Sequence, residues 1–87
     1  MNAPPRLEFP CDYPLKVVGR PAPGWRERVQ ALVRRHVPAL AAEHVSERLS
    51  ANGSFLSLSF QLRAESRAQV EALVVELQAL EGVLLLL

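Results

Sequence analysis

Apolar residues along the chain follow two different spacings, one typical of strands and the other of helices. Residues 54–64 alternate between apolar and polar side chains, which predicts a strand with one buried face and one open face. Residues 13–20 predict an earlier strand, with Leu15, Val17 and Gly19 on one face and Lys16, Val18 and Arg20 on the other. Residues 83–87 are apolar throughout and predict a final strand.

Two other segments repeat apolar residues every three or four positions, as one face of a helix does. Residues 23–37 carry such a stripe, and Pro38 ends the helix that it predicts. A second stripe follows Ser66, where Gln69 completes a capping-box pattern. Gly82 lies where a glycine can close this second helix.

The dipeptide Asn-Gly at 52–53 predicts a hairpin between residues 43–51 and 54–64, because a type I′ turn needs positive φ at both central positions. The resulting pairs are Leu49 with Leu56 and Val45 with Phe60. The same register sets Glu47 opposite Leu58 on the apolar side. A carboxylate at that place indicates that the first arm is an edge strand. We also expect a bulge in this arm.

The order strand, helix, strand, strand, helix, strand predicts an α+β, ferredoxin-like βαββαβ fold. Two helices would cover one face of a four-stranded antiparallel sheet of order 4-1-3-2. We expect a single domain over residues 13–87 and an extended, proline-rich arm over residues 1–12.

The final strand is unusual, because a sheet covered on one side should alternate and residues 83–87 do not. We therefore expect its second face to be covered by the arm, by the crossover loop or by a second copy of the chain. A further alternative is that Phe9 and Tyr13 fold over it.

Composition narrows the classes of function. The chain has 87 residues, one cysteine and a formal net charge of +1, which disfavours a strongly basic nucleic-acid module and excludes an internal disulfide or a cysteine-based zinc site. The first residues lack the apolar core of a secretory signal, and the sequence has no apolar run of membrane-spanning length. We expect a cytoplasmic protein that does not enter a membrane.

Residues able to support catalysis are few. His36 follows the apolar stripe of the first helix and His44 begins a predicted edge strand, so we expect one to be packed or capping and the other solvated. Cys11 lies among prolines, with no helix N-terminus to lower its pKa. The sequence also lacks a phosphate loop and a dinucleotide fingerprint. We predict no enzymatic activity, no metal site and no cofactor.

The run from Phe9 to Gly19, Phe-Pro-Cys-Asp-Tyr-Pro-Leu-Lys-Val-Val-Gly, resembles the opening of the YbeD-like bacterial proteins of unknown function. The segment 50–57 is similar to their Ser-x-x-Gly-x-Tyr-x-Ser hairpin, with Phe55 in place of tyrosine. Other matching positions are Pro23, Val29, Val33, His36 and Pro38. The resemblance implies a ferredoxin-like fold similar to ACT regulatory domains, which bind small metabolites at subunit interfaces. Under this resemblance, Gly19 corresponds to the glycine that ACT domains use in the loop between their first strand and first helix.

The open sheet face carries most of the candidate partner surface: Lys16, Val18, Arg48, Ser50, Phe55 and Ser57, with Ser59, Gln61 and Arg63 beside them. Arg34 and Arg35 on the outer face of the first helix would suit an acidic partner. The leading hypothesis is a small regulatory or adaptor domain that binds a protein, either an enzyme or a second copy. One alternative is an ACT-like metabolite sensor with its ligand near Gly19. Another is an RNA-binding module that stacks bases on Phe55.

Overall fold

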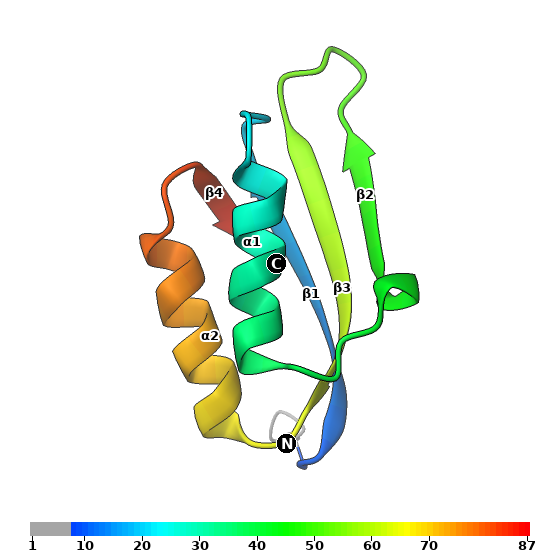
Figure 1. Ribbon diagram of the computed structural model, residues 1–87, viewed down its shortest axis with the longest axis vertical. Coiled ribbons are helices and arrows are strands. Elements are labelled where there is room, and N and C mark those ends of the chain that lie inside the picture. Colours follow the sequence, from blue (N-terminus) through cyan, green and yellow to red (C-terminus); the bar gives the residue numbers. More distant parts are fainter. Residues whose placement is uncertain (1–7) are drawn as a thin grey trace, which may run out of the picture.

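The computed structural model describes residues 8–87 as a four-stranded antiparallel sheet with two helices on one face (Figure 1). The elements are β1 (Cys11–Gly19), α1 (Trp25–His36), the 3-10 helix η1 (Ala42–His44), β2 (Val45–Leu49), β3 (Leu56–Ala64), α2 (Arg67–Ala79) and β4 (Val83–Leu86). The sheet order β2-β3-β1-β4 is the predicted order in reverse, so the predicted fold is confirmed. Residues 1–7 of the predicted arm lie outside the described residues.

The two central strands are much longer than the two edge strands. β1 and β3 pair over nine residues each, from Cys11 opposite Ala64 to Gly19 opposite Leu56. Both edge strands pair with the same end of this central ribbon: β2 reaches only to Phe60 on β3, and the pairing of β4 stops near Lys16 on β1. Among residues 8–87, no strand therefore pairs with either outer edge in the other half of the ribbon (Figure 1).

The core lies between the helices and the inner sheet face. α1 buries Trp25, Val29, Leu32 and Val33, and α2 buries Leu73 and Leu77. These side chains meet the buried strand residues Leu15, Val17, Leu56, Leu58, Phe60 and Leu62. Every second residue of β3 from Leu56 to Ala64 is buried, so the strand has the one buried face and one open face that the alternation predicted.

Both helices begin where the local backbone and its capping groups require it. α1 begins at Trp25 rather than at the predicted residue 23, because Gly24 has a φ of 78° and cannot belong to the helix. Ser66 caps α2 by accepting a hydrogen bond from the Gln69 backbone at 3.1 Å, as predicted. The Gln69 side chain in turn accepts a hydrogen bond from the Glu65 backbone at 2.7 Å.

The predicted hairpin register is confirmed, but the predicted turn type is wrong. Leu49 lies opposite Leu56, yet Gly53 is the one residue of the turn with positive φ, so Asn52 cannot form a type I′ turn. The loop is instead four residues long and closes on the pair of Ser50 and Phe55. The predicted strand register is nevertheless correct, because Asn52 and Gly53 still lie at the centre of the loop.

β2 is an edge strand, as Glu47 indicated. Glu47 lies opposite Leu58 and avoids the core by pairing with Arg26 on α1 at 2.6 Å. The pairing of β2 with β3 is continuous, so the expected bulge is absent there. A register shift occurs instead between β1 and β4, where Leu84 is the additional residue.

The predicted cover for β4 is wrong in one respect. Phe9 and Tyr13 do not fold over this strand; they line a groove along α2 with Val70 and Val74. The reason is the short pairing of β4, which ends before it reaches the part of β1 that carries Tyr13. The strand that was expected from Tyr13 also begins earlier, since Cys11 pairs with Ala64.

Candidate functional site

Four of the predicted surface residues lie together on the sheet face that the helices leave open. Across this face, Arg48 of β2 lies beside Ser57 of β3, and Ser57 lies beside Val18 of β1. Lys16 lies two residues from Val18 and points to the same side. Leu85 of β4 continues the row beyond Val18.

The same face is positively charged. Lys16 and Arg48 form no ion pair within the described part of the chain. Arg63, at the far end of the face, pairs with Asp12 at 3.2 Å. Glu47 points to the helix side of the sheet and contributes nothing here. An acidic partner surface would therefore find two available cations.

Ser50 and Phe55 flank the hairpin loop. The Ser50 hydroxyl donates to Asn52 Oδ1 and accepts from the Phe55 backbone, both at 3.0 Å. Ser50 therefore shapes the loop. The Phe55 ring is 44% exposed and extends the open face toward the loop.

Arg34 and Arg35 lie in the helix layer, on the opposite side of the sheet. Arg34 donates to Gln30 Oε1 at 3.2 Å, and Arg35 pairs with Glu76 on α2 at 2.8 Å. The predicted surface residues thus belong to two surfaces that the sheet separates, and they cannot contact one small ligand together.

Gly19 is buried beneath the indole of Trp25. A methyl group at Gly19 would overlap that ring and the carbonyl oxygen of Gly82. Gly82 lies against the same indole, where an added Cβ would lie 2.8 Å from Trp25 Cδ1. The need for glycine at position 19 is therefore explained by packing, and the Trp25 ring occupies the space next to it.

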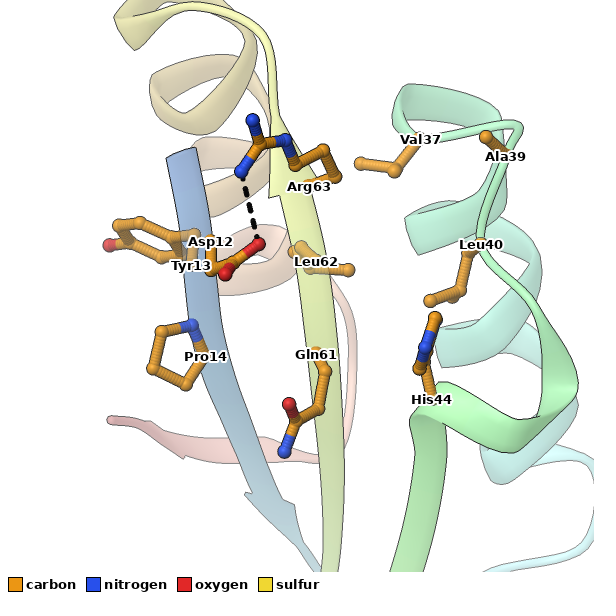
Figure 2. Close-up of a pocket in the computed structure, with 10 residues that line it drawn as sticks. All are labelled: Asp12, Tyr13, Pro14, Val37, Ala39, Leu40, His44, Gln61, Leu62 and Arg63. Carbon is orange, nitrogen blue, oxygen red and sulfur yellow. Dashed lines mark hydrogen bonds and ion pairs between the residues drawn. The ribbon is translucent and has the colours of Figure 1, made fainter. Parts of the chain in front are cut away.

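A groove beside β3 is lined by two of the residues that the sequence placed on the open sheet face, Gln61 and Arg63, and by none of the other candidate surface residues. It has a volume of about 630 Å³ and extends from residues 12–14 of β1 across the end of β3 to segment 37–44 (Figure 2). Its lining residues are Asp12, Tyr13, Pro14, Val37, Ala39, Leu40, His44, Gln61, Leu62 and Arg63.

Figure 2 shows how these residues are arranged. Val37 and Leu40 point from the connecting segment toward Leu62, and these three buried residues form an apolar floor. Gln61 and His44 lie on its polar rim. One feature of the sequence indicates this groove. The alternating pattern of residues 54–64 continues for longer than the first arm of the hairpin can pair with it.

Residues with potential catalytic chemistry lie apart. His36 pairs with Glu76, His44 lines the groove, and Cys11 is half-buried in β1. Residues 8–87 hold no group of three or more His, Cys, Asp or Glu side chains that could bind a metal ion. Neither described helix is long and apolar enough to span a membrane.

The fold is similar to that of a solved structure, the C-terminal domain of the MgtC protein from Mycobacterium tuberculosis. The two superpose with a TM-score of 0.66 over 94% of this chain and 89% of that one, at 17% identity. This similarity concerns the fold alone.

Sequence relatives are much closer. The chain is 41% identical to a UPF0250 protein of Hahella chejuensis, over 95% of this chain and 91% of the relative. It is 42% identical to a UPF0250 protein of Ectopseudomonas mendocina, over 87% and 84% of the two chains. The family model described as "Protein of unknown function (DUF493)" matches residues 4–87. These matches agree with the resemblance to the YbeD-like bacterial proteins, and the chain belongs to the DUF493 family.

Proposed function

We propose that this protein is a small, non-enzymatic adaptor or regulatory domain that binds a partner protein through its open sheet face and β4. The observation that carries the proposal is the exposure of β4. Leu84, Leu85 and Leu87 are 52%, 49% and 65% exposed. Apolar side chains gathered on one exposed strand are typical of an interaction surface.

The edge position of β4 supports the same proposal. An edge strand presents unpaired backbone groups, and soluble proteins usually protect such edges with charges, prolines or bulges. β2 follows this rule, since four of its five residues are exposed and they include Glu47 and Arg48. β4 has a bulge at Leu84 but no charged residue. A partner that covers β4 would remove this apolar surface from water.

Charge indicates what kind of protein this partner is. Lys16 lies beside Leu87, since their backbones exchange hydrogen bonds at 3.0 and 2.9 Å. Arg48 lies further along the same face. A complementary surface would be apolar opposite Leu85 and Leu87 and acidic opposite Lys16 and Arg48.

Affinity capture from an extract of the native cells tests this function. The tagged protein should retain a stoichiometric protein partner after nuclease treatment. Leu85→Lys should lose this partner, because a charge would enter the apolar surface. Val75→Lys is the matched control: Val75 is 64% exposed on α2, in the helix layer rather than on the open sheet face, and its replacement should leave capture unchanged.

Two outcomes would contradict the proposal, and a third would show that the variants have misfolded. Capture that survives Leu85→Lys would mean that β4 is not the binding surface. Capture that disappears with nuclease would favour the RNA-binding alternative. Capture that is lost equally in Val75→Lys would indicate general misfolding, which thermal unfolding of each variant can establish.

A further inference from the structure

The groove beside β3 lies where an edge strand ends and the central strand continues. The pairing of β2 with β3 begins only at Val45, opposite Phe60, because the preceding 3-10 helix η1 keeps the chain away from the sheet. β3 continues to Ala64, and within residues 8–87 no strand pairs with it on that side. We propose that an extended segment of a partner protein binds in this groove by adding a strand to the edge of β3 at Gln61 and Arg63.

The backbone of β3 is oriented for such an addition. The Phe55 carbonyl oxygen accepts a hydrogen bond from the Ser50 backbone at 2.8 Å, so odd-numbered residues of this strand direct their backbone groups toward the β2 side. Gln61 and Arg63 continue this series beyond the last β2 pair. Within residues 8–87, no hydrogen bond joins their backbone N–H or C=O groups to segment 37–44.

The floor of the groove selects the side chains of the incoming strand. The residue opposite Leu62 would point toward the helix side, onto the apolar floor of Leu62, Val37 and Leu40 (Figure 2). Its two neighbours would point to the open sheet face, toward the Gln61 amide and the Arg63 side chain. The expected segment is therefore extended and carries an apolar residue between two polar ones.

Main-chain pairing fits this groove better than binding of a small anion does. The Arg63 guanidinium is already paired with Asp12, so it does not offer an unopposed charge. Added strands derive affinity from backbone hydrogen bonds and specificity from alternate side chains.

A phage-displayed library of random linear peptides, selected on the immobilised full chain, provides the probe. Synthetic copies of selected peptides should share one apolar position and should protect the Gln61 and Arg63 amides from hydrogen exchange. Arg63→Pro removes one of these amides at a strand edge, where proline is tolerated, and should weaken peptide affinity at least about tenfold. Arg63→Ala keeps the amide and should change affinity by less than about threefold.

A second variant tests the groove without touching β3. Ala39 is exposed in the turn after α1, so Ala39→Trp can fill the groove without entering the core, and it should abolish peptide binding. Ala39→Ser is its control and should bind normally. Circular dichroism of all four variants separates lost binding from lost folding.

Several results would overturn this inference. They are selection of no peptide, peptide binding that survives both Arg63→Pro and Ala39→Trp, and amide protection at Gln61 and Arg63 before any peptide is added. Peptides that lose affinity in Leu85→Lys but not in Ala39→Trp would place binding on β4. That result would support the proposed function and reject the strand addition at β3.

Discussion

His36 and Glu76 join the C-terminal end of α1 to α2 through a hydrogen bond of 2.6 Å between the imidazole Nε2 and the carboxylate. Arg35 donates to the same carboxylate oxygen at 2.8 Å. Gln69 of α2 donates to the His36 carbonyl oxygen, also at 2.8 Å. The two helices are therefore connected by polar contacts at the surface as well as by their buried residues.

The Glu76 contacts predict a pH-dependent stability. Hydrogen bonds from His36 and then from Arg35 lower the pKa of the Glu76 carboxyl below its ordinary value of 4.5. A lowered folded-state pKa gives stability that is complete above the ordinary value and is lost as the pH falls through the lowered one. Glu76→Gln should therefore reduce the melting temperature at pH 7, and the difference should shrink below pH 4.5.

Glu71→Gln is the control for this prediction. Glu71 is an exposed carboxylate on the same helix and takes part in none of the ion pairs within residues 8–87. Its variant should melt like the wild type at both pH values. A Glu76→Gln deficit that stays constant down to pH 3 would show that the carboxylate charge is not the cause.

The contact between Gly19 and Trp25 predicts strong intolerance to any side chain at position 19. Gly19→Ala forces the new methyl group into the indole and the Gly82 carbonyl. Overpacking of this kind typically costs about 1–3 kcal/mol of unfolding free energy, measurable by urea denaturation. Gly53→Asn is the control, because its surroundings are open and asparagine tolerates positive φ.

This prediction also bears on the metabolite-sensor alternative. A loss of ligand response in a Gly19→Val variant could follow from unfolding alone, since valine is larger than alanine. If Gly19→Ala and Gly53→Asn prove equally stable, the packing explanation of Gly19 is wrong.

The Ser66 cap predicts a defined loss of helix stability. Ser66→Ala removes the acceptor for the Gln69 backbone N–H and should lower the free energy of unfolding by about 1 kcal/mol. In a domain of this size the melting temperature should fall by about 4–8 °C. Ser46→Ala, on the exposed edge strand β2, should change it far less. Equal effects of the two substitutions would refute a special role for the cap.

Glu47 predicts a change in aggregation rather than in stability. A charge on the inner side of an edge strand opposes pairing with other chains. Glu47→Val removes that charge and the surface ion pair with Arg26, which is worth at most about 1 kcal/mol. The variant should melt within a few degrees of the wild type but aggregate faster on heating, as light scattering would show. Ser46→Val, on the other sheet face, controls for added apolar surface.

Much of the fold could be predicted from the sequence because it depends on local pattern. The alternation in β3 identifies its buried side, and Ser66 with Gln69 marks the start of α2. The hairpin register followed from a symmetric loop, even though the turn type did not. Glu47 was sufficient to identify an edge strand.

The candidate site was less predictable, because it depends on where strands stop pairing. Lys16, Val18, Arg48 and Ser57 lie together because alternation assigns each to the open face. The groove beside β3 has one indirect signal in the sequence, the length of the alternation in 54–64, because the groove exists where η1 turns away while β3 continues.

Local sequence pattern specifies the order of the elements, the faces of the strands and the helix cap, since each depends on residues close together in the chain. The packing of distant segments, in contrast, places Trp25 over Gly19, brings His36 to Glu76 and leaves an edge of β3 open beside segment 37–44. The physical reason is that periodicity specifies which side of an element is buried. It does not specify which distant residue packs there or how far a neighbouring strand extends.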